Sequence, residues 1–302
     1  MTPIPQGSVD LDALTARIAA AFPDLAFARA ALNDEGEDHA VVILDDAWVF
    51  RFPRTEERRV LFETEMELLK HIGAETPVPV PQYAHVAPGA AFGGYAMIKG
   101  RPLTAAAFQA ISQPGQARVL DQMADLLCLI HSTSPKIITR EGGKVARGWN
   151  GADFARRYRA RRRERIAQVV TPRLIKAIDV FYEALAGRPA AAAETVVHGD
   201  LTADHMLLAP GGERLAGVID FADAELDDPA HDFTFFWAYG DWAPAHVAKR
   251  YGATDSGLLS RSRWSFARYR VDQLRWAADG HINNLDAPTE GEMMELFAAL
   301  GV

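Results

Sequence analysis

The sequence predicts an α+β protein with a small strand-rich part near its N-terminus and a mostly helical remainder. Short apolar runs separated by polar turns, at residues 40–44 and 48–52, indicate paired strands. Apolar residues at helical spacing over residues 56–72, and over long stretches further on, indicate amphipathic helices. A hairpin of short apolar runs between residues 196 and 219 stands among these helices. The 302 residues suffice for two lobes that share one cleft.

The N-terminal part is predicted in more detail from its apolar spacing. A helix is expected over residues 10–22, a first strand over 27–31, and a hairpin of the strands 40–44 and 48–52. The stretch 33–39 is a polar turn with a single glycine. The chain contains no G-x-x-x-x-G-K-[ST] sequence, so a P-loop is excluded.

Further helices are expected at residues 116–132, 154–169, 172–185, 245–251 and 260–279. Seven arginines lie between Arg156 and Arg165. Such a run resembles a nucleic-acid-binding patch, but we interpret it as the solvated flank of a helix. The net charge of −8 also argues against nucleic acid as a partner.

Composition points to an ordinary globular protein, with 49% hydrophobic and 24% charged residues. No apolar run is long enough to span a membrane, and Met1 to Asp10 show no secretory signal. The single cysteine, Cys128, lies in an apolar run, where we expect a small core residue. These features predict a cytoplasmic protein, and the absence of a heptad repeat predicts a monomer.

Charge is unevenly distributed along the chain. Residues 188–302 contain 9 basic and 18 acidic residues, a balance of −9, so the preceding part sums to +1. A C-terminal part with this negative charge would attract a cationic substrate. The alternative is that the acidic surface only keeps the protein soluble.

The most informative stretch is the central hairpin, because three polar side chains lie at the ends of its apolar runs. Asp200 follows Val196 and Val197, His205 precedes the run 206–208, and Asp220 follows the run 215–219. The hairpin is expected to hold Asp200, His205 and Asp220 close together. Alone, each residue is more often a turn, cap or surface residue.

This trio matches the needs of phosphoryl transfer. One carboxylate orients the attacking hydroxyl and accepts its proton, while two further groups hold the divalent ions that bridge the nucleotide phosphates. Protein kinases place an Asp, an Asn five residues later and an Asp on the next hairpin, and the offsets of Asp200, His205 and Asp220 are the same.

At these residues the chain resembles the aminoglycoside phosphotransferase family, most of all its 2''-phosphotransferase branch. The resemblance rests on His198-Gly199-Asp200, on Asp204-His205, on Phe221 after Asp220, and on the Asp-Pro-x-x-Asp-Phe run that begins at Asp228. Macrolide 2'-phosphotransferases are similar as well. The resemblance implies a protein-kinase-like bilobal fold, with an N-terminal nucleotide-binding lobe over 1–97, a hinge over 98–104 and a C-terminal lobe over 105–302.

The resemblance also implies a nucleotide site. Arg51 occupies the position where the family usually has a lysine that contacts the phosphates, and a guanidinium is longer and planar rather than a point charge. Glu65 aligns with the glutamate that pairs with this cation, although Glu63 and Glu67 are close by. Backbone groups of the hinge would hold the purine edge of ATP or GTP; the residues concerned are Met97, Ile98, Lys99 and Gly100.

Transfer of the γ-phosphoryl group to a hydroxyl of a small-molecule antibiotic is the implied reaction. Asp200 would be the catalytic base, and His205 and Asp220 would hold Mg²⁺, for which an imidazole is a poor ligand. Three acids, Asp223, Glu225 and Asp241, are the candidates for binding an aminoglycoside.

Three other interpretations remain open. The aromatic stretch after Phe233 would suit a macrolide, or the acceptor would be a small metabolite. Arg51 and His205 would also permit a nucleotide-binding pseudokinase without transfer activity. A hydrolase that uses Asp200 and His205 at a metal centre is the third.

Overall fold

Two compact units make up the chain in the computed structural model, which describes residues 9–34, 36, 38–138, 150–188, 194–280 and 287–302. The first unit contains Met1–Val145 and His198–Leu226, and the second contains Ala146–Val197 and Asp227–Val302. Most of the N-terminal segment on which the expectation about a secretory signal depends, residues 1–8, lies outside the described residues.

An antiparallel sheet of five strands forms one half of the first unit, in the order β1-β2-β3-β5-β4. Its strands are β1 (Ala30–Asn33), β2 (His39–Leu44), β3 (Trp48–Pro53), β4 (Tyr83–Val86) and β5 (Gly93–Ala96). Val41 of β2 lies opposite Arg51 of β3, and His39 lies opposite Pro53. Because side chains alternate between the two faces of a strand, this register places His39, Val41 and Arg51 on the same face.

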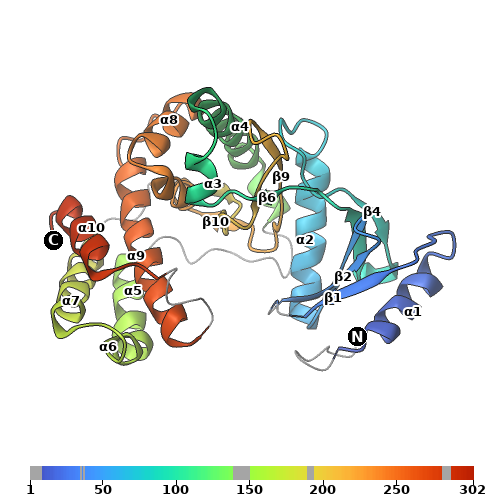
Figure 1. Cartoon of the computed structure of the whole chain (residues 1–302), viewed down its shortest axis with the longest axis horizontal. Coiled ribbons are helices and arrows are strands. Elements are labelled where there is room, and N and C mark those ends of the chain that lie inside the picture. Colours follow the sequence, from blue (N-terminus) through green and yellow to red (C-terminus); the bar gives the residue numbers. More distant parts are fainter. Residues whose placement is uncertain (1–8, 35, 37, 139–149, 189–193, 281–286) are drawn as a thin grey trace. The chain divides into compact units, whose positions relative to one another are not determined.

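Two helices, α1 (Leu11–Ala21) and α2 (Glu56–Ile72), lie on either side of this sheet, as Figure 1 shows. Leu14 and Ile18 of α1 pack with Val42, Phe50 and other strand residues into a buried apolar cluster. The opposite face of the sheet carries Arg51 toward α2.

Helix α2 has the predicted bounds, because Thr55 caps its first turn by accepting a hydrogen bond from the amide of Arg58. Its apolar spacing supplies the buried side of the helix, with Leu61, Leu68 and Ile72 among the buried residues.

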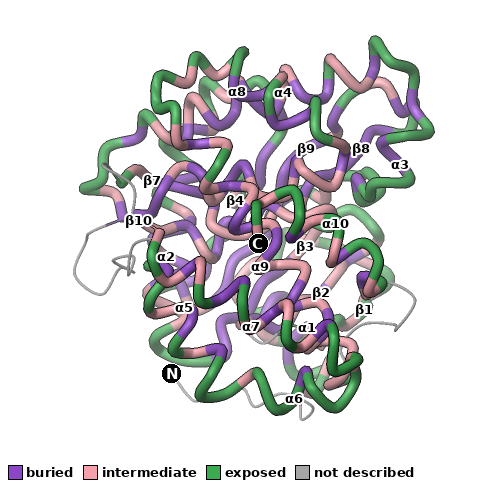
Figure 2. Tube along the Cα trace, turned by 90° about the vertical axis from the view of Figure 1, so that its left-hand side faces the viewer, coloured by how far each residue is buried: buried purple, intermediate pink, exposed green. Residues whose placement is uncertain are grey.

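The rest of the first unit surrounds a sheet of three strands in the order β6-β8-β9. Its elements are β6 (Arg101–Pro102), α3 (Ala105–Gln109), α4 (Gln113–His131), η2 (Pro135–Ile137), β8 (Met206–Leu208) and β9 (Leu215–Val218), whereas the turn η1 (Pro88–Ala90) joins β4 to β5 of the five-stranded sheet. All three residues of β8 are buried (Figure 2). The amide of Leu103 donates to the carbonyl oxygen of Met206 (2.8 Å), which continues the attachment of β6 to this sheet.

The second unit is mostly helical. Its elements are α5 (Gly151–Arg157), the π-helical turn η3 (Tyr158–Arg162), α6 (Arg163–Ala167), α7 (Pro172–Ala186), β7 (Thr195–Val197), η4 (Pro229–His231), η5 (Phe235–Tyr239), α8 (Trp242–Tyr251), α9 (Leu258–Ala278) and α10 (Glu290–Leu300). Strand β10 (Glu225–Asp227) contains residues of both units.

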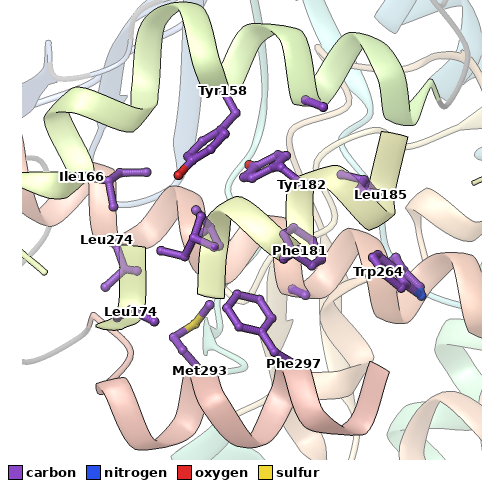
Figure 3. Packing of buried hydrophobic residues seen from close by; sticks show 14 residues of the cluster. Tyr158, Ile166, Leu174, Phe181, Tyr182, Leu185, Trp264, Leu274, Met293 and Phe297 are labelled. Carbon is purple, nitrogen blue, oxygen red and sulfur yellow. The ribbon is translucent and has the colours of Figure 1, made fainter. Parts of the chain in front are cut away.

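Aromatic side chains fill the core of the second unit (Figure 3). The ring of Phe181 on α7 stacks against Phe297 of α10 and Trp264 of α9, with centroids 5.0 and 5.3 Å apart. Tyr158 stacks on Tyr182 at 4.0 Å, and its hydroxyl donates to Asp179 (2.9 Å). Offset and stacked aromatic pairs of this kind add to the free energy gained from burial alone.

Several arginines of residues 156–165 bind acids of the same unit. Arg163 pairs with Asp179 of α7, and Arg162 pairs with Asp272 of α9. Arg165 pairs with Asp279, just past the end of α9. The interpretation of a merely solvated helix flank is therefore incomplete, because these residues join neighbouring helices of the second unit.

Several predicted bounds in the N-terminal part were wrong. The first strand covers residues 30–33 rather than 27–31, because the Asp45 carboxylate accepts hydrogen bonds from the amides of Ala28 and Arg29 (2.9 and 2.8 Å). These bonds hold the two amides outside the strand ladder. The polar turn stops before His39, which begins β2.

Other differences concern helices. Helices α3 and α10 were not predicted, although Thr289 and Glu292 form a capping box at the start of α10. Helix α4 begins at Gln113 because Ser112 caps it by accepting from the amide of Gly115. Cys128 is only partly buried on α4. Among the described residues, no helix combines the length and the apolar character that crossing a membrane requires.

Replacing Phe297 by alanine should lower the free energy of unfolding by about 3–5 kcal/mol, because it opens a cavity between α7 and α10. Val180→Ala, on the exposed side of α7, is the matched control and should change it by less than about 0.5 kcal/mol. Urea denaturation followed by circular dichroism measures both. Equal effects of the two substitutions would contradict the packing described here.

Candidate functional site

The hairpin of β8 and β9 brings the three predicted site residues together. Met206 pairs with Val218, and the amide of Ile219 donates to the carbonyl oxygen of His205 (2.9 Å). As a result, His205 Nε2 lies 3.7 Å from Asp220 Oδ2. On its other side, His205 Nδ1 lies 3.4 Å from Asp200 Oδ2.

The loop that carries Asp200 depends on a glycine. Gly199 has φ +84°, in the left-handed region, and a Cβ atom added to it would lie 2.2 Å from the carbonyl oxygen of Asp223. A side chain at this position would therefore meet both backbone strain and a collision with fixed backbone. Asp220 also lies in the left-handed region, with φ 62°, which aspartate tolerates better than most residues.

The buried imidazole of His198 supports this loop. Its Nδ1 accepts a hydrogen bond from the amide of Asp200 (3.3 Å), and its Nε2 contacts the carbonyl oxygen of Ile219 (3.1 Å). The ring also packs against Phe221, with centroids 4.4 Å apart. His198 thus links the segments that end in Asp200 and Asp220.

Arg51 lies between two carboxylates. Its Nη1 donates to Glu65 Oε1 (2.6 Å), and its Nη2 donates to Asp220 Oδ1 (2.8 Å). Arg51 and Glu65 are almost completely buried, with residue exposures of 6% and 1%. The structure therefore brings together three residues that the resemblance assigned to the phosphate and metal sites.

Burial and the neighbouring charges shift the pKa values of these groups. Burial alone raises the pKa of Asp220, but the guanidinium of Arg51 and the nearby histidines hold it well below its usual range. For Glu65, burial raises the pKa to about 7, against the opposing effect of Arg51. Although burial opposes it, Glu65 and Asp220 keep the pKa of Arg51 above its ordinary value, so the guanidinium stays charged.

The other glutamates of α2 do not meet Arg51. Glu63 accepts a hydrogen bond from Arg59 Nη1 (2.6 Å), one turn earlier on the same helix. Glu65 is the residue that faces the sheet.

Two neighbours of this ion pair were not predicted. Nδ1 of His39 lies 3.1 Å from Arg51 Nη2, and the hydroxyl of Tyr83 donates to Glu65 Oε1 (3.3 Å). The alternation of side chains along a strand could have identified His39, because His39 lies two residues before Val41 and hence on the same face of β2. Val41 is the residue opposite Arg51. That alternation becomes useful only when the register with β3 is known.

The residues predicted to hold the purine, Met97 to Gly100, follow directly after β5, and the predicted hinge 98–104 begins one residue later. The amide of Met97 donates to the carbonyl oxygen of Ala47 (2.7 Å), so this N–H group is already satisfied within the first unit. Ile98 is partly buried, whereas Lys99 and Gly100 are exposed. The amide of Met97 is therefore engaged, and purine contacts of the other backbone groups from Met97 to Gly100 stay a prediction.

The three acids proposed for an aminoglycoside come from different parts of the chain. Asp223 is partly buried, and its carbonyl oxygen is the atom that confines Gly199. Glu225 is the first residue of β10. Asp241 belongs to the second unit, where its carboxylate lies 3.3 Å from Arg263 Nη2, and this arginine stacks on Trp237.

His205 and Asp220 fit a divalent cation. His205 Nδ1 lies 2.7 Å from the carbonyl oxygen of Asp200, an acceptor, so Nδ1 carries the ring proton in the neutral form. The lone pair of Nε2 then faces Asp220 Oδ2, 3.7 Å away. His205 and Asp220 would thus offer one nitrogen and one carboxylate oxygen to a divalent cation.

Comparisons with known proteins identify the family and the fold of the chain. The model of the APH family, described as the phosphotransferase enzyme family, matches residues 30–274. The uncharacterized protein YcbJ of Bacillus subtilis (strain 168) is 23% identical over 294 residues, 90% of each chain.

Solved structures with the same fold include antibiotic kinases. The GDP and kanamycin complex of APH(2")-IIia is 20% identical and covers 96% of this chain and 98% of its own, with a TM-score of 0.75. Macrolide 2'-phosphotransferase type I is 23% identical and covers 99% of each chain, with a TM-score of 0.63. The predicted kinase-like α+β fold is thereby confirmed. Since the family model spans most of the sequence and the solved structures share its fold, the chain belongs to the APH phosphotransferase enzyme family.

Proposed function

We propose that this enzyme transfers the γ-phosphoryl group of ATP or GTP to a hydroxyl group of an aminoglycoside, and so inactivates the antibiotic. The observation that carries the proposal is the direct contact between Arg51 and Asp220, which joins the Arg51–Glu65 pair to the hairpin of Asp200 and His205. This contact supports the proposal, because it would bring bound phosphates next to the residues proposed for the metal and the reacting hydroxyl.

Each residue has a stated role in this proposal. Asp200 orients the acceptor hydroxyl and takes its proton, while Arg51, held by Glu65, binds the phosphates. His205 and Asp220 hold Mg²⁺, which would neutralise charge on the phosphate oxygens when bound. The backbone from Met97 to Gly100 binds the purine edge.

The choice of an aminoglycoside rests on charge and on similarity. Asp223 and Glu225 lie just past Asp220 and would meet ammonium groups of a polycation, and a relative of the same fold is described in complex with kanamycin. Asp241 contributes less than the sequence indicated, because it already pairs with Arg263.

A macrolide is the second candidate acceptor. The aromatic segment 235–239 is followed by Trp242, whose exposure of 42% is high for so large an apolar side chain. A macrolide 2'-phosphotransferase also shares the fold.

We further propose that the enzyme is monomeric and cytoplasmic and binds no nucleic acid. Its lobes would span residues 1–97 and 105–302, and its hinge residues 98–104.

Replacing Asp200 by asparagine should lower turnover by about 10²–10⁴-fold, because an amide does not accept the proton of the hydroxyl. Binding of ADP or GDP should stay within about threefold of wild type, since Asp200 does not hold the nucleotide. Asp204→Asn, at the exposed neighbouring acid, is the matched control and should keep full turnover. A variant Asp200→Asn that remains active would exclude the assignment of the base.

A coupled assay of nucleoside diphosphate release should show stimulation by aminoglycosides with a free 2''-hydroxyl, tested with ATP and GTP in parallel. Stimulation by macrolides instead would move the acceptor site to the aromatic segment. Nucleotide binding without stimulation by any antibiotic or small alcohol would support a pseudokinase. Phosphate release at a rate that depends neither on an acceptor nor on the identity of the nucleotide would support a metal-dependent hydrolase.

His205 should leave a signature in the metal dependence. An imidazole suits Mn²⁺ better than Mg²⁺, whereas an amide oxygen is a hard ligand that suits both. The ratio of kcat/KM with Mn²⁺ to that with Mg²⁺ should therefore fall by about tenfold in His205→Asn. An unchanged ratio, measured at saturating metal, would show that His205 is not a metal ligand.

A further inference from the structure

A buried imidazole beside Arg51 has no role in the proposed function. His39 begins β2 and is only 4% exposed. Its Nδ1 lies 3.1 Å from Arg51 Nη2. Because a guanidinium only donates hydrogen bonds, Nδ1 accepts here, and the proton of the neutral ring resides on Nε2.

The surroundings keep this imidazole neutral. Burial and the charge of Arg51 lower the pKa of His39 to about 2, with smaller contributions of the same sign from Arg58 and Arg54, and Asp220 opposes them. A protonated ring would place two cations in contact. His39 thus remains an acceptor throughout the physiological pH range.

The fold, rather than Arg51, sets the position of the ring. His39 lies opposite Pro53, and Arg51 lies opposite Val41, so His39 is the diagonal neighbour of Arg51 on the same face of the sheet. Long side chains reach one another across such a diagonal. Phe62 of α2 packs against the imidazole, with ring centroids 5.7 Å apart.

His39 completes the set of acceptors around the guanidinium. Glu65 accepts from Nη1, whereas Asp220 and His39 both accept from Nη2, which carries two hydrogens. Together the three acceptors fix the plane of the guanidinium. A lysine ammonium is a compact point charge whose hydrogens rotate freely about one bond, so it has no plane of donors that a third acceptor would have to fix.

The other ring nitrogen points to function rather than stability. Nε2 of His39 is buried and has no hydrogen-bond partner among the described residues. A buried donor without a partner destabilises the folded state, so an apolar side chain would fill this position at lower cost if packing were its only task.

We propose that His39 is a positioning residue for Arg51: it fixes the guanidinium between Glu65 and Asp220, and thereby lets an arginine replace the lysine that binds phosphates in the resembling kinases. The proposal rests on the proposed phosphate-binding role of Arg51. It makes His39 and Arg51 a functional pair, in which neither residue has its full effect without the other.

The test is a double-mutant cycle in the full-length chain, with titration calorimetry of ADP and GDP in the presence of Mg²⁺. His39→Leu should weaken binding by about tenfold, because it leaves one buried N–H of Arg51 unpaired. His39→Asn, whose amide oxygen replaces the Nδ1 acceptor, should stay within about threefold of wild type. In the Arg51→Lys background, His39→Leu should cause no further loss.

Two controls separate positioning from general damage. His71→Leu, at an exposed histidine of α2, should leave nucleotide affinity unchanged. In ¹⁵N–¹H spectra of the chain without nucleotide, the Nη hydrogens of Arg51 should give separate signals in wild type and in His39→Asn, and averaged signals in His39→Leu. These spectra report the orientation of the guanidinium whether or not the chain binds nucleotide.

Each outcome has a defined meaning. The proposal is overturned if His39→Leu keeps both the affinity and the separate Arg51 signals, if His39→Asn behaves like His39→Leu, or if the loss is equally large in the Arg51→Lys background. If the spectra respond to His39 as expected but wild type binds neither ADP nor GDP, the nucleotide-dependent function fails while the positioning of Arg51 stands.

Discussion

One buried guanidinium holds the candidate site together. Arg51 comes from β3, Glu65 from α2 and Asp220 from the turn after β9, and they meet at 2.6 and 2.8 Å. A buried charge is costly unless it is paired, and here two carboxylates and an imidazole surround it. The sheet, its helix and the central hairpin are therefore coupled by charge, and removal of Arg51 would leave Glu65 and Asp220 without the cation between them. We regard this coupling as a constraint on the function more than as a source of stability, since buried ion pairs are often no better than apolar packing.

The hairpin imposes a second constraint, on backbone geometry. His198 bonds to the amide of Asp200 and contacts the carbonyl oxygen of Ile219, while the carbonyl of His205 receives the amide of Ile219. These bonds set the separations among Asp200, His205 and Asp220 before any ligand binds. Preorganisation of this kind is what electrostatic catalysis requires, because groups already in place need no reorganisation when charge develops.

Local sequence signals predicted the parts of the fold that depend on local interactions. Helix α2 was predicted over its full range, because its cap and its apolar spacing act within a few residues. The trio of the hairpin was predicted because a hairpin joins neighbours in the chain. By contrast, the position of β1 depends on Asp45, which lies 17 and 16 residues after the amides of Ala28 and Arg29 that it binds. The contact of His39 with Arg51 depends on strand register. Asp241 pairs with Arg263, which belongs to a different helical segment. The number of acidic residues in the C-terminal part therefore overstated the negative charge that is available to a substrate.

Gly199 limits which parts of this site can change in sequence when acceptor specificity changes. Its positive φ and the carbonyl oxygen of Asp223, which a Cβ atom would approach to 2.2 Å, exclude every other amino acid without a shift of backbone. The residue lies between the proposed base and its supporting histidine, so a shift there would displace the base itself. New acceptor specificity, whether selected in nature or in a combinatorial library, must then come from side chains on the surrounding elements. The position of the proton acceptor stays constant while the surface that chooses its substrate varies.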